Sequence, residues 1–248
     1  MNTVFQLTRT ELIVYFRDWQ AAFWTFFFNL IILFVFGWVF GNEPGGMGGE
    51  FGFVDMFLPG LIGISIVAIA VFTIGSSVVE YRERAVLKRY LVTPVKPEQL
   101  ISSFLLLGFL LLLMNALISI VAAIFIFGAP LPANPTGVAV ATMLSALAFY
   151  SIAFLLFSFV KTVKAAGAIA AIILNFSMIL SGAFLPLEIF PTFIQYITYI
   201  NPLMYTVDVL QGMWLTGDSF RDHYLHLSVL TTMFMVASFL ASRFFRWV

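Results

Sequence analysis

Charged residues are scarce in this chain, and cysteine is missing altogether. Of the 248 residues, 12 are Lys or Arg and 12 are Asp or Glu, which is 10% of the chain. Soluble domains carry about 25% charged residues, so the composition excludes an ordinary soluble protein. Without cysteine, a disulfide scaffold, thiol catalysis and a cysteine metal site are excluded as well.

Motifs for nucleotide binding and catalysis are also absent. The only Lys that precedes Ser or Thr is Lys161, and no glycine-rich loop comes before it, so no Walker A site for ATP exists. Ser65 follows a Gly-x pattern but lacks the second glycine of a serine hydrolase. His223 and His226 are the only histidines, and we expect them to be surface residues. We therefore predict a chain that is not an enzyme and binds no metal or cofactor.

Long apolar runs dominate what is present. Hydrophobic residues make up 62% of the chain, with 30 Phe, and the mean hydropathy is +1.04. A helix needs about 20 apolar residues to cross a membrane, and prolines between 128 and 135 divide the longest run. The sequence predicts an all-α membrane protein with one transmembrane domain over 1–248. The six expected spans are 19–42, 56–79, 100–127, 137–160, 165–185 and 224–242.

Segment 189–207 is an alternative seventh crossing, since it holds no charge but contains Pro191, Asn201 and Pro202. With six spans, 11 of the 12 basic residues lie on the side of the termini, and only Arg221 lies opposite. Because Lys and Arg in short loops favour the cytoplasm, we expect six spans and cytoplasmic termini. Residues 186–222 are then expected to form an outer re-entrant helical hairpin, with two short helices joined near Asn201. A surface hairpin without a gating role remains the alternative.

Residues 1–20 precede the first span and are expected to form an interfacial helix. Apolar side chains gather on one face of a helical wheel, and polar ones lie opposite. The alternative is a straight extension of the first span. We expect no cleavable signal, because the apolar run exceeds the core of about 7–15 residues that signal peptides have.

The loop 80–98 carries the densest charge in the chain and is expected to face the cytoplasm. Glu80 and Arg84 stand four residues apart in the order that stabilises a helix, and Pro94 ends that helix. We interpret the loop as a docking surface for a cytoplasmic partner, with an ordinary positive loop as the alternative. Since no ionisable residue lies in the middle of a span, the chain has no relay for an ion-driven pump. Either a partner supplies the energy or the protein is passive.

Three features together resemble permease subunits of the ABC-2 family, the membrane half of ATP-binding-cassette exporters. The stretch Glu80–Pro94 is similar to the family's E-R-E-R…L-K…L…T-P pattern, with Ala85 where glycine is common. Ser181-Gly-x-Phe-x-Pro-Leu-Glu followed by Asn201-Pro-Leu-x-Tyr is similar to the family's pattern around the fifth span. The layout of six spans matches over the whole chain.

The resemblance implies a permease that pairs with a second permease chain, identical or not, and with two copies of an ABC ATPase subunit that hold ATP and Mg. It implies a cytoplasmic (inner) membrane location, contact with membrane lipid and no contact with nucleic acid. The residues expected to contact the ATPase are Arg9, Glu80, Arg82, Glu83, Arg84, Lys88, Arg89, Lys161 and Lys164.

The resemblance also implies a pathway built from the first, second and fifth spans. The expected pathway residues are Phe27, Asn29, Ser65, Thr73, Asn175, Ser177 and Ser181, and the expected outer gate is Phe184, Pro186, Asn201, Pro202 and Tyr205. A mostly apolar wall suits an amphipathic, drug-like or lipid-like cargo for export. Export of a polysaccharide or glycolipid is the alternative within the class, and a passive channel or scaffold is the alternative outside it.

Overall fold

The computed structural model describes residues 3–45, 50–86, 95–184, 187 and 190–244, and the regular elements in these ranges are helices without strands. In chain order they are α1 (Thr3–Arg17), α2 (Trp19–Phe40), α3 (Phe53–Ala68), η1 (Ile69–Gly75), α4 (Ser76–Glu83), α6 (Pro97–Phe127), α7 (Pro135–Phe157), α8 (Val163–Ile179), α9 (Thr192–Thr198), α10 (Pro202–Gln211), η3 (Gly212–Thr216) and α11 (Tyr224–Phe244). The expected all-α class is therefore confirmed over the described residues.

Five stretches of helix are long and apolar enough to cross a membrane: α2, the continuous rod Phe53–Glu83, Glu98–Phe127, α7 and α11. The helix at the expected fifth span, α8, is apolar but has only 17 residues. At about 1.5 Å per residue it is shorter than the hydrocarbon layer of about 30 Å. The expected span 165–185 overran this helix, because residues 180–184 form turns and bends. A sixth crossing therefore stays a prediction.

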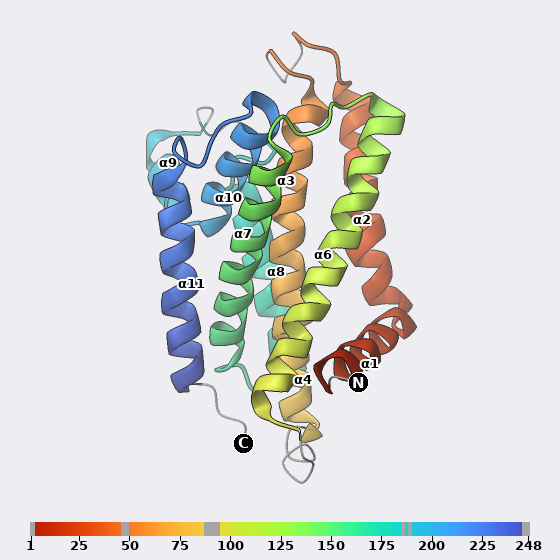
Figure 1. Cartoon of the computed structure of the whole chain (residues 1–248), viewed down its shortest axis with the longest axis vertical. Coiled ribbons are helices and arrows are strands. Elements are labelled where there is room, and N and C mark those ends of the chain that lie inside the picture. The colour runs from red at the N-terminus through yellow and green to blue at the C-terminus, as the bar shows by residue number, and fades with distance from the viewer. Residues whose placement is uncertain (1–2, 46–49, 87–94, 185–186, 188–189, 245–248) are drawn as a thin grey trace.

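The rod Phe53–Glu83 forms the centre of the bundle (Figure 1). Of its most hydrophobic window, 89% is buried, against 17% for α2 and 11% for α11. Its α3 portion packs against α2, α6, α7, α8 and α10. Gly108 of α6 allows one close approach, because a Cβ there would lie 2.8 Å from Ile74 of the rod. The fold thus wraps the other helices around the second expected span.

The rod is not uniformly α-helical, since η1 between Ile69 and Gly75 is a π-helix. Ser76 follows it and donates a hydrogen bond from Oγ to the carbonyl of Val71 at 3.2 Å. A π-helical turn adds a residue to the turn and rotates the side chains that follow, and such turns are frequent at functional sites. Two residues of this π-helix, Phe72 and Thr73, line the cavity described below.

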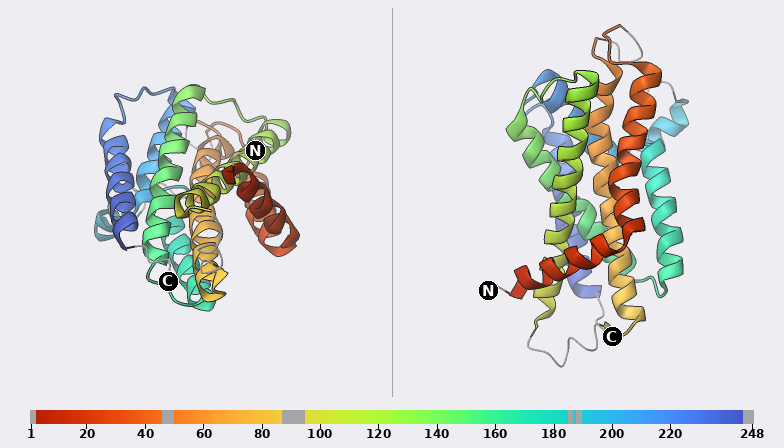
Figure 2. Two further views of the ribbon diagram at one scale, coloured as in Figure 1. Left: turned by 60° about the horizontal axis from the view of Figure 1, so that its bottom comes forward. Right: turned by 90° about the vertical axis from the view of Figure 1, so that its right-hand side faces the viewer.

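The N-terminal helix α1 is separate from α2 and lies at a steep angle to it, across the side of the bundle (Figure 2). The two helices part at Asp18, whose carboxylate accepts hydrogen bonds from the amides of Gln20 and Ala21, each at 3.2 Å. Such a side-chain cap starts a new helix. Glu11 and Tyr15 of α1 are buried against the protein, whereas Phe5 and Phe16 are exposed. An interfacial position of α1 in the membrane stays a prediction.

Two short helices, α9 and α10, lie on either side of Asn201, where the sequence placed such a pair. The buried Asn201 side chain accepts a hydrogen bond from the Leu203 amide at 3.1 Å and donates one to the Ser177 carbonyl at 2.8 Å. It thus caps α10 and ties it to α8. Helix α10 packs against α3, α11 and α7. The re-entrant depth of this segment in a membrane stays a prediction.

Candidate functional site

A cavity of about 570 Å³ lies between α1, α2, the rod Phe53–Glu83, α6 and α8. Its volume falls within the range of about 300–1,000 Å³ that is usual for small-molecule sites. One group of lining residues is acidic, a second is aromatic and a third carries amides or hydroxyls. The acidic residues are Glu11, Asp18 and Glu80, the aromatic ones include Tyr15, Trp24, Phe28 and Phe72, and those with amides or hydroxyls include Thr25, Asn29, Ser65, Thr73 and Asn115.

A buried polar network joins three helices at the wall of the cavity. Asn29 of α2 donates from Nδ2 to Ser65 Oγ at 2.6 Å and to Asn115 Oδ1 at 2.8 Å. Asn115 of α6 in turn donates to the carbonyl of Thr25 at 2.5 Å. Polar side chains inside a membrane bundle hydrogen-bond across helices, so this network fixes α2, α3 and α6 relative to one another. It also presents amide and hydroxyl groups to the cavity.

Three carboxylates line the part of the cavity that α1 and α4 form. Asp18 caps α2, and Glu80 pairs with Arg84 at 3.1 Å. Glu11 is buried and accepts a short hydrogen bond from the hydroxyl of Tyr81. Burial raises the pKa of Glu11, the nearby Glu80 charge raises that pKa further, and the Tyr81 hydrogen bond opposes both effects. A positive charge close to Glu11 would favour its ionised form.

The charge of the cavity wall has one sign among its described residues, since none of the lining residues is Lys, Arg or His. Four aromatic side chains, Tyr15, Trp24, Phe28 and Phe72, line the same space. Aromatic faces attract cations, and apolar rings accept the tail of an amphipathic molecule. The cavity therefore offers complementary surfaces to a molecule with a positive head and an apolar body.

Only some of the expected pathway residues line the cavity. Asn29, Ser65 and Thr73 line the cavity. Phe27 is 55% exposed and lies outside the lining, as does the exposed Asn175, which hydrogen-bonds within α8. Ser177 and Ser181 are buried in the protein but do not line the cavity.

Glu11 and Asn115 belong to the cavity but are missing from the sequence-based expectations. Asn115 is the single Asn in the span 100–127, and an amide side chain inside a span is a recognisable signal. Glu11 could not be found this way, because its burial depends on how α1 folds back onto α6.

Two of the residues expected to contact the ATPase make hydrogen bonds within the chain, and their contact with the ATPase stays a prediction. The Arg82 guanidinium donates to the carbonyls of Ser158 at 2.6 Å and Phe157 at 2.8 Å, at the end of α7. The Glu83 carboxylate accepts from the Val163 amide at 2.5 Å, at the start of α8. The end of α4 thus holds the adjacent ends of two further helices.

The other residues expected to contact the ATPase do not all lie on the protein surface. Glu80 lies in the cavity wall and pairs with Arg84. Arg9, Arg84, Lys161 and Lys164 are exposed. Lys88 and Arg89 lie outside the described residues.

The described residues expected at the outer gate pack against or hydrogen-bond to other parts of the chain. Phe184 packs against Phe36 and Phe57, with ring centroids 5.4 and 5.0 Å apart. Pro202 begins α10 after the Asn201 cap, and the Tyr205 hydroxyl donates to the Tyr199 carbonyl at 2.7 Å. Pro186 lies outside the described residues. A gating role for this set stays a prediction.

Comparison with known proteins identifies the family. The sequence model described as "ABC-2 type transporter" matches residues 2–215. The chain belongs to the ABC-2 type transporter family. Membership assigns this ABC-2 chain to the permease components of ABC transporters, which are typically non-catalytic membrane subunits, and it implies an ABC ATPase as partner.

Curated relatives agree with this assignment. The chain is 26% identical over 174 residues to the inner membrane transport permease YadH of Escherichia coli (strain K12), covering 70% of this chain and 67% of the relative. The proteins of the same name from Escherichia coli O157:H7 and Shigella flexneri give the same values.

Proposed function

We propose that this ABC-2 chain is the permease subunit of an exporter in the inner membrane, with both termini in the cytoplasm. Two permease chains form the pathway, and two separate ATPase subunits drive it by ATP hydrolysis. The cargo is an amphipathic molecule with a positively charged head. The relatives named as inner membrane permeases support the location, and the family supports the ATPase partner.

The cavity carries the proposal about cargo. Glu11, Asp18 and Glu80 make one part of it acidic, and the aromatic wall supplies apolar and cation-binding surface. Glu80 is paired with Arg84, and burial raises the pKa of Glu11, so a bound positive head would favour the ionised form of Glu11. Charge-assisted hydrogen bonds contribute about 1.5–3 kcal/mol, which corresponds to about one to two powers of ten in affinity. A neutral or anionic molecule of the same shape gains none of this energy. An anionic glycolipid or polysaccharide would meet repulsion at the same place.

The contacts of Arg82 and Glu83 supply a route for the driving force. A partner that moves the loop 80–98 also moves the ends of α7 and α8, because these two side chains hold them. Helix α8 contributes Leu174 to the cavity wall, and α4 contributes Glu80. Displacement of the loop by the ATPase would thereby change the shape of the cavity.

The test uses the permease reconstituted with its ATPase in proteoliposomes. We expect ATP-dependent transport of an aryl quaternary ammonium, and slower transport of the neutral analogue with the same apolar body. Glu11→Gln should weaken the apparent affinity for the cation about tenfold and leave the neutral analogue unchanged. Glu43→Gln is the matched control, because this carboxylate is exposed after the end of α2, far along the chain from the loop 80–98, and lies outside the cavity.

Two outcomes would contradict the proposal in different ways. Equal transport of the cation and its neutral analogue would refute the cargo class while leaving the ATP-driven permease intact. Movement of solute by the permease alone, without ATPase or nucleotide, would refute the permease role and favour a passive channel.

A further inference from the structure

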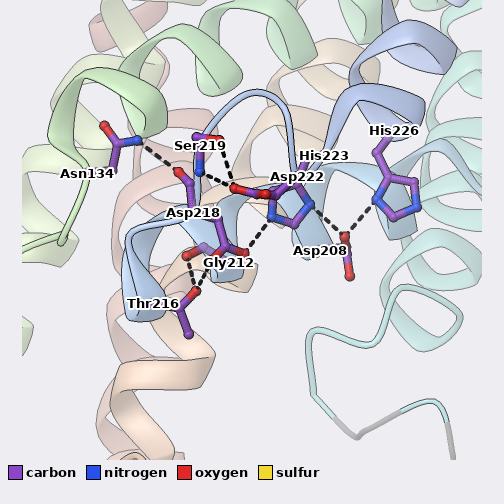
Figure 3. Close-up of polar contacts among 9 residues, drawn as sticks. All are labelled: Asn134, Asp208, Gly212, Thr216, Asp218, Ser219, Asp222, His223 and His226. Atoms are coloured by element: carbon purple, nitrogen blue, oxygen red, sulfur yellow. Dashed lines mark hydrogen bonds and ion pairs between the residues drawn. The ribbon is translucent and has the colours of Figure 1, made fainter.

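A second group of titratable side chains lies away from the cavity, where α10 meets the start of α11 (Figure 3). Asp208 projects from α10, His223 directly precedes α11, and His226 lies in its first turn. The same carboxylate oxygen of Asp208, Oδ2, lies 3.1 Å from His223 Nδ1 and 2.7 Å from His226 Nδ1. Three possible ligand atoms from two elements thus converge.

The ring of His223 lies between two carboxylates. Its Nε2 lies 2.9 Å from Asp218 Oδ2 and its Nδ1 lies 3.1 Å from Asp208 Oδ2. A carboxylate only accepts, so each ring nitrogen needs either a hydrogen or a metal ion between it and the oxygen that it faces. His226 Nδ1 is closed off from solvent and makes no aligned hydrogen bond, although it lies close to the same oxygen. A cation between these nitrogens and the Asp208 oxygen, either a proton or a metal ion, would satisfy all three groups.

We propose that Asp208, His223 and His226 bind a divalent transition-metal ion, with Zn²⁺ as the best fit. Zinc takes His nitrogen at about 2.0–2.1 Å and carboxylate oxygen at about 2.0–2.2 Å in a tetrahedral arrangement. Two such bonds at the tetrahedral angle hold their ligand atoms about 3.3–3.4 Å apart. The three ligand atoms lie within 4.8 Å of one another, and two of the pairs are 3.1 and 2.7 Å apart, so small shifts of the side chains would fit them around one ion. Two imidazoles exclude the all-oxygen sites that Ca²⁺ and Mg²⁺ prefer. Solvent reaches Asp208 and can supply the fourth ligand.

Surrounding residues hold the ligands in place. A His that binds a metal usually donates its other ring N–H to a carboxylate, and Asp218 occupies that position for His223. Asp218 is itself fixed, because Thr216 donates to its Oδ1 at 2.6 Å and Asn134 donates to its carbonyl at 2.9 Å. Gly212 leaves the necessary room, since a Cβ there would lie 2.3 Å from His223 Nε2.

The site would join two elements that differ in how far they are buried. Helix α10 is buried on most sides, whereas only Leu230 and Ala237 of α11 are buried. A metal bound to Asp208 and both histidines would fix the start of α11 to α10. On the orientation expected from the basic residues, this end faces the outside of the cell, so the ion would come from that compartment.

The test titrates ZnCl₂ into the purified full-length chain after chelator treatment, with a purification tag that contains no histidine. Calorimetry should give one Zn²⁺ per chain, and bound Zn²⁺ should raise the melting temperature. His223→Gln and His226→Gln should each weaken binding at least about 100-fold. Asp218→Asn should weaken it about 10- to 100-fold, as loss of a supporting partner does. Because the chain has no cysteine and no other histidine, background binding should be low.

Asp222→Asn is the control, since this carboxylate accepts hydrogen bonds from Ser219 and lies outside the proposed ligand set. It should bind Zn²⁺ as the natural chain does. Failure of the folded natural chain to bind one Zn²⁺ would overturn the proposal, and so would binding by both histidine variants that is as tight as binding by the natural chain. If the natural chain ignores Zn²⁺ but gains stability as the pH falls through the histidine range, a proton holds the cluster instead and the metal site is refuted.

Discussion

Ala85 is the one residue other than glycine, among those the structure describes, whose φ is positive, at 53°. It follows α4, at a place where a left-handed residue commonly ends a helix. A side chain with a Cβ pays about 1–2 kcal/mol for this conformation. The sequence had already marked position 85 as alanine where glycine is common among ABC-2 permeases, and the backbone explains that preference.

Replacing Ala85 with glycine should therefore stabilise the protein. We expect Ala85→Gly to raise the free energy of unfolding by about 0.5–1 kcal/mol, because relief of the left-handed strain exceeds the added entropy of the unfolded chain. Denaturant unfolding in detergent, followed by circular dichroism, measures the difference. Ala168→Gly in the exposed face of α8 is the control and should lower stability by about the same amount. A stabilising effect at both positions, or at neither, would contradict the explanation.

Helix ends and helix interiors differ in how far the sequence could predict them. The expected start of the first span at 19 and of the last at 224 agree with α2 and α11, because Asp18 and the polar segment before Tyr224 mark them. The π-helix within the rod was not predicted, since its residues are as apolar as those of an ordinary span. The convergence of His223 with Asp208 was also missed, because the two residues come from different elements and only packing brings them together.

The end of α4 gives a prediction that separates structural residues from docking residues. Arg82→Met should lower the free energy of unfolding by about 1.5–3 kcal/mol, since it removes the donors to the carbonyls that end α7. Arg84→Met should cost less than about 1 kcal/mol, because Arg84 is 72% exposed and its ion pair with Glu80 is solvated.

Copurification with the ATPase completes this comparison. Arg84→Glu should reduce recovery of the ATPase while leaving the unfolding midpoint close to that of the natural chain. If Arg82→Met and Arg84→Met destabilise the protein equally, the assignment of Arg82 to the α4–α7 junction is wrong. If Arg84→Glu copurifies normally with the ATPase, this end of α4 is not a docking surface.

At the scale of the whole molecule, α1 and the last turn of α11 lie at the same end of the bundle (Figure 1). This agrees with an even number of crossings, and the orientation of that end in the membrane can be measured directly. The natural chain has no cysteine, so single cysteines can be introduced without a background signal.

We expect Ser219→Cys to react with a membrane-impermeant maleimide in cells whose outer membrane has been made permeable and whose inner membrane is intact. Lys161→Cys should react only after the inner membrane is opened, because six spans place the two positions on opposite sides. Both residues are exposed, so access to the side chain is not limiting. Labelling of both positions from the same side would require a different number of crossings.

The central position of the rod Phe53–Glu83 has a consequence for biogenesis. The ribosome delivers this segment early, and at that moment only lipid and α2 can surround it. Its final neighbours α7, α8 and α10 emerge later. The second crossing must therefore exchange surrounding lipid for protein after it has entered the bilayer. A nascent chain that stalls before α10 would leave the segment that is most buried in the finished protein without part of its protein contacts.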